Sequence, residues 1–167
     1  MGLTKLFGLT ITDDGTTLDD PSPSFVGCCQ QHHLTRADTL TELTSGSAGL
    51  AVVMDDHTHY RVEVDAEQIS AIVRIRPVEQ VLGRAPRPPG PTELVIETTA
   101  GALGPDQVRL GFTNEAGDLV ALASPDGRYL STEVTTGFIG RVIGIYASGG
   151  TAAFDRFRLT PADTGNR

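Results

Sequence analysis

The 167-residue sequence predicts an all-β protein, built as an antiparallel β-sandwich or jelly roll. Short segments rich in Val and Ile recur along the chain at intervals of roughly 8 to 12 residues. Turn-forming residues separate these segments, as in NEAGD, SPDG and ASGG. No segment has the periodicity of a helix longer than about two turns. Together these three observations favour a sandwich over any helical fold.

Each expected strand follows from alternating apolar residues or from a run of β-branched ones. The first is LTKLFG (3–8), followed by the extended run SFVGCCQQHHLT (24–35). In QISAIVRIR (68–76), four apolar residues from Ile69 to Ile75 share one face. RAPRPPGP (84–91) is expected to be a stiff crossing loop. The later strands are expected at residues 49–55, 59–65, 68–76, 92–98, 106–114, 118–124, 128–134, 140–148 and 152–159.

The size and composition predict one domain, residues 1–159, followed by a polar and flexible tail, residues 160–167. A net charge of −8 excludes nucleic acid as the expected partner. No apolar run is long enough to span a membrane, and the N-terminus is a poor secretory signal. The two cysteines are adjacent, which disfavours a disulfide between them and favours a reducing, cytoplasmic location.

CCQQHH (28–33) is the one place where metal-binding side chains crowd together in the sequence. On an extended strand Cys28 and His32 lie roughly 13 Å apart, too far to share one zinc ion. His57 and His59 could add ligands from one face of another strand. A purely structural role, as a half-buried strand with polar side chains on one side, is favoured over a metal site or a catalytic Cys–His pair.

Several motifs in order resemble the C-terminal β-sandwich of glycoside hydrolase family 43, a concanavalin A-like domain of bacterial β-xylosidases and arabinofuranosidases. The resemblance covers about Leu3 to Leu159. Family members tend to carry Arg where Cys28 and Cys29 stand here. The motifs are SPSFVGCCQQHH, SAGLAVVMDDHTHYRVEV, DGRYLSTEV and GFIGRVIGIYASGGTAAFDRFRL.

The resemblance implies a non-catalytic accessory domain that packs on a catalytic propeller and shapes its pocket. It also implies that the chain lacks the family domain's first strand and the propeller with its carboxylates. We therefore expect no catalytic residue and no enzyme activity from the chain alone. In related xylosidases an aromatic of a sandwich loop reaches the substrate pocket, and Phe138 is similar to it in placement. An ordinary core phenylalanine is the favoured alternative for Phe138.

No cofactor or metal is expected. The candidates weighed for a metal are Asp155, His32, His57 and His59, and calcium is the ion considered for Asp155. A surface ion pair is the favoured interpretation of Asp155. The acidic pairs such as Asp13–Asp14 are expected to be solvated turn residues rather than an acid–base pair.

Two other functions remain as alternatives. An autonomous carbohydrate-binding, lectin-like module would bind pentose-containing oligosaccharides, yet the chain has no Trp, and Tyr60, Tyr129 and Tyr146 lie in apolar strands that predict burial. A homodimeric interaction domain would pair exposed strand edges with a second copy. An exposed aromatic row would favour the first alternative, and a large apolar patch would favour the second.

Overall fold

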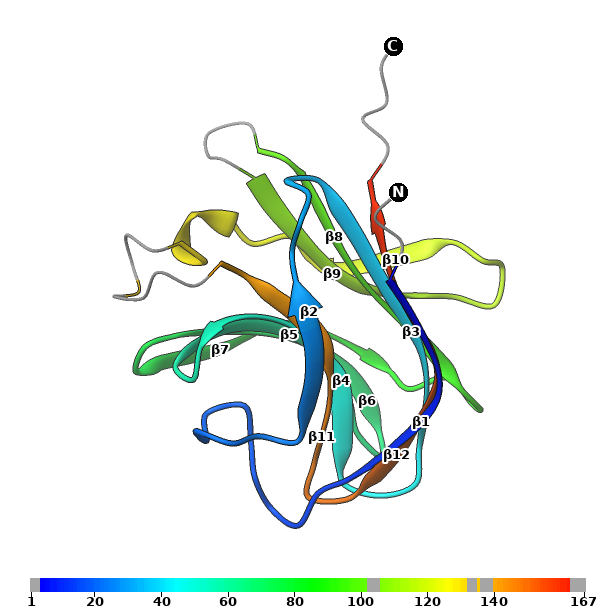
Figure 1. The fold of residues 1–167 in the computed structure, drawn as a ribbon. Coiled ribbons are helices and arrows are strands. Elements are labelled where there is room, and N and C mark those ends of the chain that lie inside the picture. The colour runs from blue at the N-terminus through cyan, green and yellow to red at the C-terminus, as the bar shows by residue number, and fades with distance from the viewer. Residues whose placement is uncertain (1–3, 102–105, 132–134, 136–139, 163–167) are drawn as a thin grey trace.

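The computed structural model describes residues 4–101, 106–131, 135 and 140–162, with residues 4–7 described by their backbone only. The chain folds into two layers of antiparallel strands, and β1 and β12 lie side by side (Figure 1). Over the described residues the elements are β1 (Thr4–Thr12), β2 (Phe25–Cys29), β3 (Thr35–Leu43), β4 (Ser47–Asp55), β5 (Thr58–Val64), β6 (Gln68–Ile75), β7 (Val78–Pro86), β8 (Thr92–Ala100), β9 (Asp106–Thr113), β10 (Leu119–Ala123), the 3-10 helix η1 (Gly127–Tyr129), β11 (Val142–Ser148) and β12 (Thr151–Pro161).

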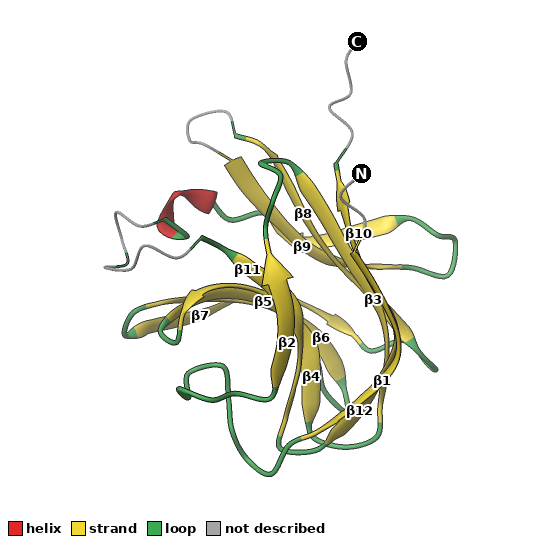
Figure 2. Cartoon of the chain, viewed as in Figure 1, coloured by secondary structure: helices red, strands yellow, loops and turns green. Residues whose placement is uncertain are grey.

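Over the described residues the strands form two six-stranded sheets. Figure 2 shows that strands make up most of the fold. Sheet A has the order β1-β12-β3-β8-β9-β10, and sheet B has the order β2-β11-β4-β5-β6-β7. All recorded pairings are antiparallel, and several join strands far apart in sequence, such as β1 with β12. The predicted all-β antiparallel sandwich is therefore confirmed. No helix in the described part of the chain has the length and apolar character needed to cross a membrane.

Apolar and charged side chains alternate along β5, and this pattern shows how the sequence forms sheet B. Tyr60, Val62 and Val64 point into the core, while Arg61 and Glu63 lie on the outer face of sheet B. A strand turns successive side chains to opposite faces, so one strand serves the core and a polar surface at once. The largest fully buried side chains of the core include Phe154, Phe157, Leu50, Ile69, Leu94, Ile96, Leu110, Ile143 and Ile145.

Two strands were not predicted, β3 and β7. Buried positions of β3 are filled by polar residues, including Thr39 and Asp38, so the strand lacks apolar alternation. Burial of Asp38 is compatible with folding because Arg156 and Arg158 of β12 pair with its carboxylate at 3.3 and 2.9 Å. Strand β7 is an edge strand with mostly exposed side chains, and it takes in residues 84–86 of the predicted crossing loop.

Three predicted boundaries were wrong. The strand expected over residues 24–35 stops at Cys29 and resumes only at Thr35, as β3. The strand expected over residues 128–134 does not begin at residue 128, because residues 128 and 129 belong to η1. Asp126 caps η1 by accepting a hydrogen bond from the Arg128 amide at 2.8 Å. Strand β12 extends to Pro161, so residues 160 and 161 of the predicted tail pair with β3.

Candidate functional site

One end of the sandwich carries a cavity of about 350 Å³ between the loop after β2 and the segments before β11. We call the surface around it the η1 end, after the helix beside it (Figure 1). The lining residues are Gln30, Gln31, His32, His33, Asp106, Ser131 and Arg141. The cavity brings together the CCQQHH motif, the start of β9 and the segment before β11, which are far apart in the sequence.

Arg141 and Asp106, which both line this cavity, form an ion pair. The Nη1 and Nη2 atoms of Arg141 donate to the two carboxylate oxygens of Asp106 at 2.5 and 2.9 Å, and Asp106 is fully buried. Arg141 also donates to the carbonyls of Leu130 at 3.0 Å and Gly127 at 2.8 Å. A Cβ atom at Gly127 would collide with the Asp106 carboxylate, so only glycine fits there. One arginine thus fixes η1 and β9 relative to β11.

The loop of residues 30–33 owes its shape to Gln30. Its backbone amide donates to the carbonyl of Arg141 at 2.8 Å, which continues the β2–β11 pairing by one residue. Its side chain then donates to the carbonyls of His32 and His33 at 2.7 and 3.1 Å, which closes a turn. The Gln30 side chain thus occupies backbone carbonyls that strand pairing would otherwise use, which explains why the predicted strand stops before His32.

The residues weighed for a metal site are not brought together. His32 lies in the exposed loop at the η1 end, and His57 lies half exposed in the β4–β5 turn, 3.9 Å from Asp56. His59 is buried on the outer face of sheet B. Among the residues that the structure describes, no group of three or more His, Cys, Asp or Glu could hold a metal ion. Phe138 lies outside the described residues.

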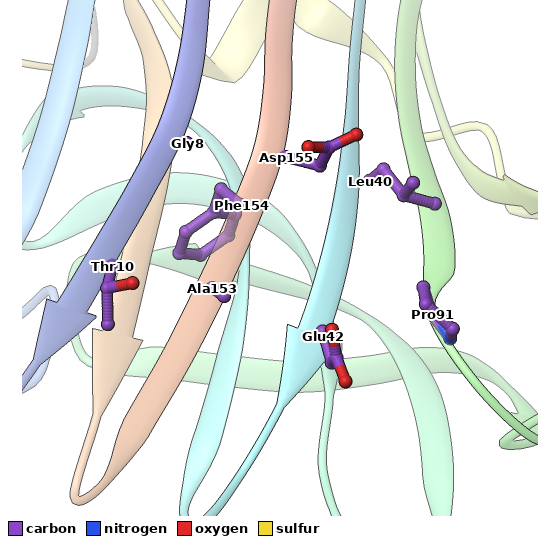
Figure 3. Close-up of a pocket in the computed structure, with 8 residues that line it drawn as sticks. All are labelled: Gly8, Thr10, Leu40, Glu42, Pro91, Ala153, Phe154 and Asp155. Atoms are coloured by element: carbon purple, nitrogen blue, oxygen red, sulfur yellow. The ribbon is translucent and has the colours of Figure 1, made fainter.

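Asp155 lies in a depression of about 350 Å³ on the outer face of sheet A (Figure 3). The registers of β1 and β12 skip Gly8 and Asp155 at this point, and Gly8 has a φ of 62° that favours glycine. The bulge leaves Asp155 exposed beside Leu40. Its neighbour Arg156, in contrast, pairs with Asp38 and Glu93.

The tyrosines divide into two groups. Tyr60 and Tyr146 are buried, as predicted, but Tyr129 in η1 is 43% exposed, so its predicted burial is wrong. Tyr60 Oη donates to the carbonyl of Asp126 at 2.5 Å, which holds the start of η1 over β5. Val78, at the start of β7, is also exposed, at 60%. It lies at the end of sheet B where β11 begins, which is the η1 end. The η1 end therefore presents two exposed side chains with apolar surface, Tyr129 and Val78, neither of which is among the residues that line the cavity.

A second polar region, which the sequence did not indicate, lies on the outer face of sheet B. We call it the polar cluster. The Asp19 carboxylate accepts a hydrogen bond from His59 Nε2 at 3.0 Å and lies 2.8 Å from Arg74 Nε. Arg61 pairs with Glu63 and Glu79 at 3.3 and 3.5 Å. The members are Asp19, His59, Arg61, Glu63, Arg74, Glu79 and Tyr146, drawn from a loop and strands β5, β6, β7 and β11.

The loop between β1 and β2 covers part of this face. Leu18 is buried against Ala51 and Tyr146, which anchors the middle of the loop. Asp13 anchors its start, since its carboxylate accepts hydrogen bonds from Ser24 Oγ at 2.6 Å and from the amide of Gly149 at 2.9 Å. Asp13 was expected to be a solvated turn residue, yet it is buried and links the loop to the β11–β12 turn.

Burial makes His59 sensitive to pH. It lowers the pKa of the ring below the ordinary value of 6.5, and the nearby Asp19 only partly offsets that effect. Below about pH 6.5 the unfolded chain binds a proton that the folded chain binds less tightly. The free energy of unfolding should therefore fall on acidification, by at most about 1.4 kcal/mol per pH unit from this group. Chemical unfolding of the native chain and of His59→Gln between pH 5 and 8 measures it, and parallel pH profiles would contradict it.

One family model matches most of the chain. Residues 7–160 match the family described as the β-xylosidase C-terminal concanavalin A-like domain. The solved BlXynB protein of glycoside hydrolase family 43 from Bacillus licheniformis is similar with a TM-score of 0.80 at 20% identity, over 93% of this chain. The Bacteroides ovatus Xyloglucan PUL GH43B protein is similar with a TM-score of 0.80 at 24% identity, over 93% of this chain.

The xylan β-1,4-xylosidase from Bacillus halodurans C-125 is also similar, with a TM-score of 0.74 at 19% identity over 95% of this chain. The chain spans only a third of the length of these three solved proteins, 33% in each case. No curated protein sequence matches the chain. The likeness to the solved structures shows the fold, and the family match covers nearly all of the chain.

Proposed function

The chain belongs to the family of β-xylosidase C-terminal concanavalin A-like domains, and from this we propose that it is a non-catalytic accessory domain that docks on a catalytic domain and shapes its substrate pocket. The observation that carries the proposal is that the match covers nearly all of this chain but only a third of each solved protein. The remaining two thirds of such a protein supply the domain on which this one would dock.

The η1 end is the surface that best suits this docking. Its loops are held in place by the Arg141–Asp106 pair, while its outer side chains, Tyr129 and Val78, are exposed. Exposed tyrosine is enriched in protein interfaces. Phe138, whose position in the sequence is similar to that of a family aromatic at the substrate pocket, precedes Arg141 by three residues.

A graft tests the proposal. The C-terminal third of the Bacillus halodurans xylosidase is replaced by this chain, and hydrolysis of an aryl xyloside is compared with that of the enzyme lacking the third. We expect the graft to regain at least a tenth of the parent activity, and Tyr129→Asp in the graft to remove most of that gain. Burying an unpaired charge in an interface costs several kcal/mol.

Val26→Asp is the matched control, because Val26 is also exposed, at 39%. Val26 lies in the first half of β2, where it pairs with Ile145 of β11, away from the η1 end. It should leave the activity of the graft unchanged. A graft no more active than the truncated enzyme, or equal loss of activity in the two Asp variants, would contradict docking by the η1 end.

A further inference from the structure

A small cavity opens in the outer face of sheet B, at the polar cluster and beside the β1–β2 loop. Its volume is about 180 Å³. Loop residues form one wall, and strands β4, β5, β7 and β11 supply the rest. The lining residues are Thr17, Leu18, Asp19, Ser47, His59, Arg61, Glu63, Glu79, Tyr146 and Ser148. This cavity plays no part in the docking proposed for the η1 end.

The size of the cavity limits its ligand. Its volume equals that of about six water molecules at roughly 30 Å³ each. It is smaller than the roughly 300 Å³ at which pockets for drug-sized molecules begin. A single sugar ring or a shorter polyol fits such a volume, whereas an oligosaccharide chain does not.

The charges around the cavity nearly balance. Arg61 and Arg74 oppose the three carboxylates of the polar cluster, and each carboxylate lies within 3.5 Å of a guanidinium nitrogen. His59 adds no positive charge at neutral pH, because burial lowers the pKa of its ring. The carboxylates disfavour an anionic ligand, and the arginines disfavour a metal cation. A neutral molecule is the class that remains.

Donors and acceptors alternate around the same space. Arg61 is a fixed donor, held between Glu63 and Glu79. Glu63 also accepts a hydrogen bond from Tyr146 Oη at 2.6 Å. Burial, and to a smaller extent the negative charge of Glu63, raise the pKa of the Tyr146 phenol, so the phenol keeps its proton. Hydroxyl groups of a polyol both donate and accept, so they suit carboxylates beside a guanidinium.

His59, which lines the cavity, carries one buried nitrogen without a partner among the described residues. His59 is 1% exposed, and this nitrogen is its Nδ1 atom. Buried polar atoms are almost always paired, and an unpaired one costs about 1–3 kcal/mol. That nitrogen is itself buried, so a ligand would contact the accessible parts of Arg61, Glu63 and Glu79, whose side chains are 12%, 21% and 40% exposed.

We propose that this cavity binds a small neutral polyhydroxy compound of the size of one sugar ring, held by Arg61, Glu63 and Glu79. Glu63 and Glu79 accept from its hydroxyls, and Arg61 donates to its oxygens. The ion pairs that already hold these side chains preorganise the site, which lowers the entropic cost of binding.

Titration of the chain with D-xylose, followed by amide chemical shifts in NMR, tests the proposal. We expect saturable shifts at Ser47, Ser148 and Glu79 with a Kd in the millimolar range, at or above about 1 mM. Glu79→Gln removes one charged acceptor at an exposed edge and should weaken binding about tenfold. Ser47→Leu, which narrows the cavity without changing a charge, should weaken it at least as much.

Glu115→Gln is the matched control, because Glu115 lies in an exposed turn between β9 and β10 and lines none of the cavities described above. It should bind D-xylose like the native chain. Three results would overturn the proposal: no saturable shift up to about 100 mM D-xylose, equal affinity of Glu79→Gln and Glu115→Gln, or displacement of the sugar by inorganic phosphate. None of them would alter the outcome of the graft, which tests the η1 end.

Discussion

Arg141→Met is expected to lower the free energy of unfolding by about 3–5 kcal/mol. The substitution leaves the fully buried carboxylate of Asp106 without its partner, and removes the donors to the carbonyls of Leu130 and Gly127. An uncompensated buried charge is among the most costly defects in a folded protein. Urea unfolding followed by circular dichroism measures the change.

Arg109→Met provides the control, since Arg109 pairs with Glu97 at 3.3 Å and its side chain is 40% exposed. A surface pair of this kind contributes at most about 1 kcal/mol. Adding Asp106→Asn to Arg141→Met should recover part of the loss, because the buried charge is then gone. Equal stability of the Arg141 and Arg109 variants would show that the ion pair does not hold the η1 end.

Asp13→Ala should destabilise the fold by about 3 kcal/mol, the second largest effect we expect. Its carboxylate accepts from the amides of Gly15 and Gly149 and from the hydroxyls of Thr16 and Ser24. Hydrogen bonds to a charged acceptor contribute about 1.5–3 kcal/mol each, though not additively. Thermal unfolding at pH 7 measures the loss, and proteolysis should then cut the β1–β2 loop sooner.

The pH dependence of Asp13 follows from the same contacts. Burial alone would raise its pKa, but the hydrogen bonds, led by that of Ser24, outweigh burial and hold the pKa well below the ordinary value. The stabilisation is therefore complete above about pH 4 and is lost only as the pH falls further. Asp14→Ala, next to it and exposed, should change the stability by less than about 0.5 kcal/mol. A similar loss in both variants would contradict the role of Asp13.

The strands with apolar alternation could be predicted from the sequence, and β5, β6 and β8 were found close to where their patterns placed them. Strand β3 could not, because its polar residue Asp38 is buried only by virtue of two arginines about 120 residues further on. The hydrophobic pattern of a segment indicates which of its side chains face the core. It does not indicate which distant residue will pair with a carboxylate and so allow its burial.

The candidate sites were harder to predict for the same reason. Asp13 and Asp14 look alike in the sequence, and only the approach of the β11–β12 turn makes one of them buried. The polar cluster joins Asp19 to Arg74 and Glu63 to Tyr146, pairs separated by more than fifty residues. The one available signal was the alternation of His59, Arg61 and Glu63 on β5, which places all three on one face.

Docking on a separate catalytic domain is tested most directly by the hydrolysis of aryl xyloside and aryl arabinofuranoside. Both substrates are offered to the chain alone and to the chain grafted onto the truncated xylosidase. We expect no turnover above the buffer rate from the chain alone and clear turnover from the graft. Turnover by the isolated chain, or a graft that is no better than the truncated enzyme, would contradict the proposed accessory role.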